Sequence, residues 1–112
     1  MKIDIRTHGF ALTDAIRNHV ERRMRFVLAR AHAHIRQVTV HLADIEGQRG
    51  GIEKRCRVRV RLKPGVDLLV EDTEAELYAA VDRAADRVGR SVVRSVTRRG
   101  RAAADSTTET ET

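Results

Sequence analysis

The sequence predicts an α+β two-layer sandwich in the order β-α-β-β-β-α, with a four-stranded sheet and both helices on one face. Four segments alternate apolar and polar residues with a period of two, which is typical of strands that bury one face. Two longer segments repeat apolar residues every three or four positions, as amphipathic helices do. Because each strand has a single apolar face, both helices must cover the same side of the sheet.

The N-terminal half is expected to supply a strand, a helix and a second strand. Residues 2–6 alternate, and Thr13 then precedes an acid as a helix N-cap would. The helix is expected to continue to about Arg30 on the apolar positions Ile16, Val20, Met24, Val27 and Leu28. Residues 35–44 return to a period of two. The right-handed crossover rule predicts that the first two strands are parallel.

The C-terminal half is expected to supply two more strands and the second helix. Glycines at 47, 50 and 51 indicate a flexible connection before a strand at residues 55–63, and Pro64-Gly65 indicates a turn into a fourth strand. Thr73, with Glu76 three positions later, is expected to cap the second helix, and Gly100 to end it. The apolar stripe of this helix comprises Leu77, Val81, Ala84, Ala85, Val88, Val92 and Val96.

Length and composition favour one small cytoplasmic domain. The 112 residues contain one cysteine, so no internal disulfide can form. No segment is apolar enough to be a signal peptide or a membrane span. Residues 101–112 hold one arginine and three acids and no large apolar residue, and we expect them to form a disordered tail. Residues 1–100 are expected to form the domain.

The charge distribution favours a polyanionic partner. The whole chain carries a net charge of +6, and its last twelve residues carry −2, so residues 1–100 carry +8. A strongly basic domain attracts nucleic acid because each phosphate that it neutralises releases counterions. With no membrane anchor visible, nucleic acid is the expected partner.

Two sets of basic residues are candidate RNA-binding sites. On the third strand, Arg57 and Arg59 belong to a stripe opposite the apolar face; the stripe is either a nucleic-acid contact or a solvated face neutralised by Asp67 and Glu71. The helices carry the second set, which is either a phosphate-binding surface or ordinary pairing with Asp82 and Asp86. Its candidate residues are Arg22, Arg23, Arg25, Arg30, Arg83, Arg87, Arg90 and Arg94.

The sequence predicts no enzyme, cofactor or metal site. His32 and His34 flank one alanine without a nearby acid or thiol, so solvated histidines are expected there. Cys56 falls on an apolar strand face and is expected to be a core residue. Aromatic residues amount to 3%, which favours recognition of the RNA backbone and shape over base stacking.

The helical motifs resemble a known family. The sequence L-Y-A-A-V-D from Leu77 to Asp82, followed by D-R-V-G-R-S-V from Asp86 to Val92, resembles the M-Y-A-A-I-D…D-K-L-x-R-Q-L signature of ribosome hibernation-promoting factors and ribosome-associated inhibitors. The segment T-D-A-I-R-N-H-V from Thr13 to Val20 is similar to that family's T-E-A-L-R-E-Y-V. The resemblance covers about residues 1–99.

The resemblance implies a function and several site residues. It implies binding to the small ribosomal subunit and its rRNA in the mRNA and tRNA channel, which inhibits translation and preserves idle ribosomes. Arg87 and Arg90 match basic positions of the family's second helix, Arg94 matches a position that is often basic, and Arg23 matches one in the first helix. Phe26 falls where many members have lysine, and Arg25 or Arg30 is expected to compensate.

Two departures from the family's usual pattern indicate which of its members the chain resembles. The glycine-rich segment at residues 44–51, with K-R-C at residues 54–56, resembles a divergent subgroup of small members. The resemblance does not extend to the extra C-terminal domain by which long members pair ribosomes, so we expect the chain to resemble the short forms. The alternative function is a basic protein-protein interaction module, or a homodimer that pairs through its sheet edge.

Overall fold

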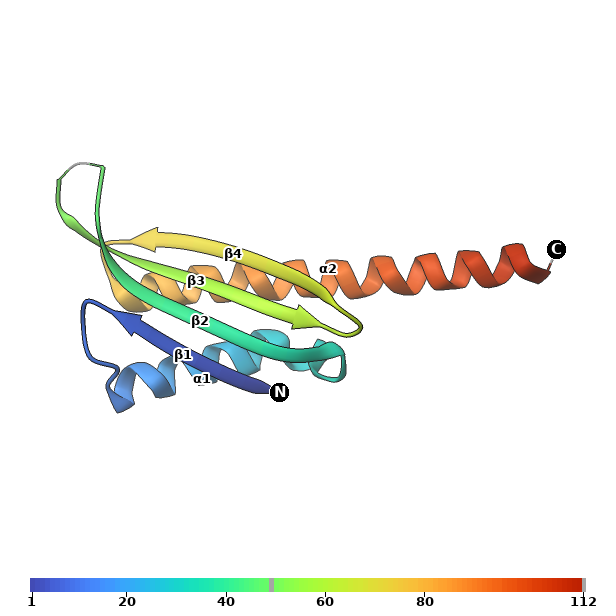
Figure 1. Ribbon diagram of the computed structural model, residues 1–112, viewed down its shortest axis with the longest axis horizontal. Helices are drawn as coiled ribbons and strands as arrows, with labels where there is room; N and C mark the ends of the chain where they lie inside the picture. The colour runs from blue at the N-terminus through green and yellow to red at the C-terminus, as the bar shows by residue number, and fades with distance from the viewer. Residues whose placement is uncertain (49, 112) are drawn as a thin grey trace.

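The predicted order of strands and helices is confirmed. The computed structural model describes residues 1–48 and 50–111, with side chains described as far as residue 100. It contains β1 (Lys2–His8), α1 (Asp14–Leu28), a 3-10 helix η1 (Ala29–His34), β2 (Ile35–Glu46), β3 (Ile52–Leu62), β4 (Val66–Glu74) and α2 (Leu77–Glu111). Figure 1 shows both helices behind the sheet, so the fold is the expected α+β two-layer sandwich.

The four strands form one mixed sheet in the order β1-β2-β3-β4. β1 and β2 are parallel, as the right-handed crossover rule predicts, and the other two pairs are antiparallel. The register aligns Ile5, Val40, Val58 and Val70 across all four strands. All four are buried, so the period of two places one continuous apolar face under the helices.

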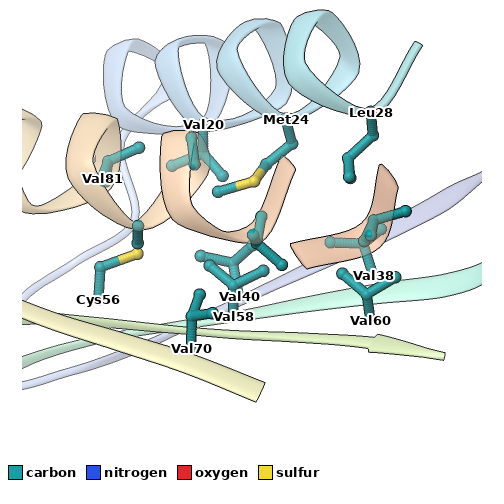
Figure 2. Close-up of a cluster of buried hydrophobic side chains, with 14 of the residues drawn as sticks. Val20, Met24, Leu28, Val38, Val40, Cys56, Val58, Val60, Val70 and Val81 are labelled. Carbon is teal, nitrogen blue, oxygen red and sulfur yellow. The ribbon is translucent and has the colours of Figure 1, made fainter. Parts of the chain in front are cut away.

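The core lies between this face and the helices (Figure 2). Val20, Met24 and Leu28 of α1 point toward the strands, and each is at most 1% exposed. Cys56 is fully buried among them, as expected of a core residue. Burial, with a smaller contribution from the nearby Asp72 carboxylate, raises the pKa of its thiol to about 12. The thiol is therefore protonated at neutral pH and is not a nucleophile.

One predicted helix cap is confirmed and the other is wrong. The Thr13 hydroxyl accepts a hydrogen bond from the backbone N–H of Ile16 at 3.2 Å, which satisfies a donor in the first turn of α1. Thr73 instead lies within β4, opposite Arg55 of β3. The pairing of β4 continues as far as Glu74, and α2 begins only at Leu77. The strand register therefore takes precedence over the local capping pattern at this position.

The helix ends also differ from the sequence expectation. α1 ends at Leu28, and η1 continues from Ala29 to His34, so His32 and His34 lie in a helical turn. The expectation that α2 ends at Gly100 is wrong, because the helix runs to Glu111. The division into a domain of residues 1–100 and a disordered tail of residues 101–112 stays a prediction.

The described part of the chain shows no metal or membrane feature. Within it, no three residues of the types His, Cys, Asp and Glu converge as a metal site would require. His32 Nε2 lies 3.3 Å from the N-terminal amine of Met1. Over the same residues, neither helix is both long and apolar enough for a membrane crossing.

The two helices approach closely at Gly89. A Cβ atom at this position would lie 2.9 Å from the Cβ of Val27 and 3.1 Å from its carbonyl oxygen. Such distances are shorter than van der Waals contact, so any larger residue would push α2 away from α1. Gly89 therefore sets the separation of the helices.

We predict that Gly89→Ala lowers the free energy of unfolding by up to about 2 kcal/mol, measured by urea denaturation. Alanine favours a helix by about 1 kcal/mol over glycine, but overpacking at a helix contact costs about 1–3 kcal/mol. Gly100→Ala is the matched control, since nothing lies within 4 Å of a Cβ there and only the helix preference acts. If Gly89→Ala raised the stability by about 1 kcal/mol, as the helix preference alone would at Gly100, the helix contact would be shown to yield freely.

Candidate nucleic-acid interface

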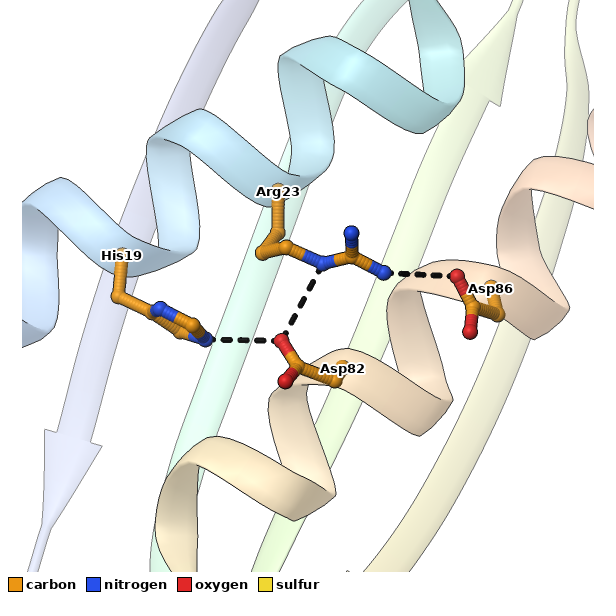
Figure 3. Close-up of polar contacts among 4 residues, drawn as sticks. All are labelled: His19, Arg23, Asp82 and Asp86. Atoms are coloured by element: carbon orange, nitrogen blue, oxygen red, sulfur yellow. Dashed lines mark hydrogen bonds and ion pairs between the residues drawn. The ribbon is translucent and has the colours of Figure 1, made fainter.

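A polar cluster joins the two helices on their exposed side (Figure 3). His19 Nε2 donates to Asp82 Oδ1 at 2.8 Å, and Arg23 Nη2 donates to Asp86 Oδ1 at 2.7 Å. Arg23 Nε also lies 3.2 Å from Asp82 Oδ1. The two aspartates of α2 are therefore occupied by α1, and Arg23, a candidate RNA-binding residue, is held in a structural contact.

Two arginines of α2 contact residues of β4. Arg83 forms an ion pair with Glu74. Arg87 Nη1 donates to the carbonyl oxygen of Glu71 at 2.8 Å and to Asp72 Oδ2 at 3.0 Å. The side chain of Asp72 is only 11% exposed, so this contact is partly shielded from water. Both candidates therefore help to fasten α2 to the edge of the sheet.

We predict that Arg87→Ala lowers the free energy of unfolding by about 1 kcal/mol, because it removes two hydrogen bonds and leaves a partly buried carboxylate without its partner. The matched control is Arg94→Ala, an exposed position of the same helix, which should change stability by less than about 0.5 kcal/mol. Thermal and urea denaturation of the two variants measure the difference. Equal effects would mean that the contact with β4 contributes nothing.

The basic stripe of β3 is neutralised in part by β4. Arg59 Nη2 donates to Asp67 Oδ2 at 2.6 Å, and Arg57 Nη2 donates to Glu71 Oε1 at 3.4 Å. The same two acids also pair with Arg55 and Arg61. The hydrogen bond from Arg59 is the largest cause of a lowered pKa at Asp67. Four arginines thus share two carboxylates on the open sheet face, so the pairing that the neutralised alternative predicted compensates half of their charge.

We predict that the carboxyl of Asp67 titrates below the usual aspartate range and that Arg59→Ala raises its pKa. The lowered pKa means that the ion pair is fully present above the ordinary aspartate pKa and is lost as the pH falls through the folded value. An NMR pH titration of the side-chain carboxyl carbons measures both proteins. Arg36→Ala, which removes an exposed charge without contacting Asp67, should leave the titration unchanged.

The remaining candidates form a separate exposed group. Over residues 1–48 and 50–100, no acid lies within ion-pair distance of any of five exposed arginines on the helical layer. We call these the helical arginines: Arg22, Arg25, Arg30, Arg90 and Arg94. An arginine with no acidic partner keeps its planar set of donors available for an anion.

Three of the helical arginines border an open groove between α1 and α2. The helix groove has a volume of about 820 Å³, within the range of small-ligand sites. Its lining consists of Phe26, Val27, Ala29, Arg30, Asp86, Gly89, Arg90, Val93 and Arg94. Phe26 and Val93 are 76% and 42% exposed, so the groove combines apolar side chains with a cationic border.

The structure divides the candidates more finely than the sequence did. Arg23, Arg83, Arg87, Arg57 and Arg59 contact acids of the protein itself, whereas the helical arginines point to solvent. Sequence reasoning did not find the helix groove. The signal available for it was Gly89, a glycine within a helical pattern, which is often a site of close packing. The role of the candidate arginines in RNA binding stays a prediction.

The family assignment rests on comparison with known proteins. Residues 3–100 match the family model described as sigma 54 modulation protein / S30EA ribosomal protein. The chain belongs to this family. The match confirms the membership that the helical motifs predicted, and it extends from the second residue of β1 to Gly100 within α2. No curated protein sequence matches the chain significantly.

Two solved structures have a similar fold. The Protein Y N-terminal domain of Thermus thermophilus is 34% identical; the match covers 84% of this chain and 98% of that domain, with a TM-score of 0.70. A ribosomal subunit interface protein of Coxiella burnetii is 17% identical. The match covers 87% of this chain and 99% of that protein, with a TM-score of 0.72. The second likeness concerns the fold alone.

Proposed function

We propose that this protein binds the small ribosomal subunit in the cytoplasm, in the channel used by mRNA and tRNA, and keeps idle ribosomes inactive. The helical arginines bind rRNA phosphates, and the body of the sandwich occupies the channel. The protein acts by occupancy and carries out no chemical step.

The observation that carries the proposal is the difference between the two basic surfaces. On the sheet, Asp67 and Glu71 already hold the arginines of β3 in ion pairs. On the helical layer, the acids Asp82 and Asp86 are occupied by His19 and Arg23. Among residues 1–48 and 50–100, the helical arginines form no ion pair, so a polyanion need displace no acid of this part of the chain to bind them.

Membership of a family named for a ribosomal protein supports a ribosomal partner. The likeness to the Protein Y N-terminal domain includes nearly all of that domain. Arginine suits rRNA because its guanidinium donates two parallel hydrogen bonds to one phosphate. Binding several phosphates also releases counterions, so affinity is expected to fall steeply with salt.

The alternative is a basic module that binds an acidic protein, or a homodimer that pairs through the sheet edge. The exposed Leu69 and Val66 of the edge strand β4 favour it. Such a partner would engage the sheet and depend on Arg57 and Arg59 more than on the helices.

We predict that the purified protein co-sediments saturably with small ribosomal subunits and that Arg90→Ala/Arg94→Ala reduces the affinity by more than about ten-fold, since each lost charged hydrogen bond is worth about 1.5–3 kcal/mol. The slope of log affinity against log salt concentration should be less steep by about 1.5 in this variant, because two phosphate contacts are lost. Sedimentation at rising salt, with separated subunits and whole ribosomes, measures both quantities.

The matched control is Arg57→Ala/Arg59→Ala, which removes an equal number of positive charges, two, from the sheet face. If both double variants lose affinity equally, net charge and not the helical surface governs binding. Wild-type protein that stays in the supernatant at low salt would overturn the ribosomal function. Loss of binding only in the sheet variant would favour the protein-partner alternative.

A further inference from the structure

Phe26 is the most exposed large apolar side chain of the described residues. Its 76% exposure contrasts with Val20, Met24 and Leu28 of the same helix, which are at most 1% exposed. A single exposed apolar residue is common on protein surfaces. Phe26, however, lines the helix groove together with Val93, which is 42% exposed, so the two form one small apolar surface.

The other two aromatic rings are already engaged within the protein. Tyr78 stacks on His19 with ring centroids 4.2 Å apart and an interplanar angle of 6°. Phe10 packs against the core and lies under the Lys54 ammonium, 5.3 Å from the ring centroid. Over residues 1–48 and 50–100, no ring or cation lies against Phe26. Its π-face is thus available to a ligand.

Several arginines line the groove that Phe26 lines. Arg30, Arg90 and Arg94 line the same groove as Phe26. Arg22, four residues before Phe26 on α1, shares its side of the helix. The one acid of the groove, Asp86, is already paired with Arg23 at 2.7 Å. The groove therefore presents a flat apolar ring together with three arginines.

We propose that the helix groove binds an unpaired RNA nucleotide, whose base stacks on Phe26 while its neighbouring phosphates contact Arg30, Arg90 and Arg94. Proteins that bind single-stranded RNA combine these elements, because every base offers a π-face and every linkage a charge. This inference rests on the proposed function and adds to it: the site selects unpaired nucleotides over a continuous duplex, in which the bases are stacked on one another.

The shape of the groove favours RNA over an acidic peptide helix. Helices that bind in grooves use a row of apolar anchors at positions i, i+4 and i+7, which requires an extended apolar floor. The helix groove offers only two substantially exposed large apolar side chains, Phe26 and Val93. One base has the size and the flat face that a single ring matches.

The first test compares short single-stranded RNA with abasic RNA of the same length. Both carry the same phosphates, and only the first can stack. Wild-type protein should bind the base-containing oligonucleotide about ten-fold more tightly, and Phe26→Ala should remove this preference while keeping the salt slope. Phe26→Tyr should retain the preference and Phe26→Leu should lose it, which separates ring stacking from simple apolar contact.

A spectroscopic test follows from the composition. The chain contains no tryptophan, so Phe26→Trp introduces a unique fluorophore at an exposed position that tolerates the larger ring. Single-stranded RNA should quench this fluorescence, and abasic RNA should not. Equal quenching by both would overturn the proposal, because it would place phosphates and no base beside the ring. Circular dichroism of each variant confirms that the fold is kept.

The failure of this inference and that of the proposed function give different results. If small subunits bind Phe26→Ala as tightly as wild type and abasic RNA binds as well as intact RNA, the stacking site is wrong while ribosome binding stands. If subunits do not bind but the preference for bases over abasic RNA depends on Phe26, the stacking site stands and the ribosomal partner is wrong. Binding of polyglutamate that depends on Phe26, with no preference for bases, would assign the groove to an acidic protein.

Discussion

The sheet has only one apolar face, and this constraint determines where everything else lies. Both helices must cover that face, so they lie side by side and contact each other at Gly89 and Val27. The opposite side of each helix then faces solvent, as far as the side chains are described. A broad polar surface on the helical layer is thus a direct consequence of how the core is buried.

The positions of the acids decide what each arginine can do on this surface. Asp82 and Asp86 lie between the helices and bind α1, while Asp72 lies at the sheet edge and binds Arg87. The acids that stabilise the fold are thereby already paired with basic residues of the protein. Arg90, with no such partner among the described residues, remains available for phosphate, although it lies only three residues from Arg87 on the same helix.

The sequence was sufficient for the fold because strand alternation and helical periodicity are local patterns. It failed at Thr73, where the local capping pattern competed with strand pairing and lost. It proposed the candidate arginines but could not separate Arg87 from Arg90, because the groups that hold Arg87 belong to β4 and meet it only in the tertiary structure. Gly89 likewise has no visible role until Val27 is placed beside it.

The burial of Cys56 has a practical consequence for studying the motions of this protein. It is the only thiol in the chain, it lies between the helices and the sheet, and it is protonated at neutral pH. An alkylating reagent can therefore reach a reactive thiolate only while the two layers are transiently separated. The rate of covalent labelling reports how often the sandwich opens, and its slowing on a ligand would measure how strongly that ligand holds the layers together.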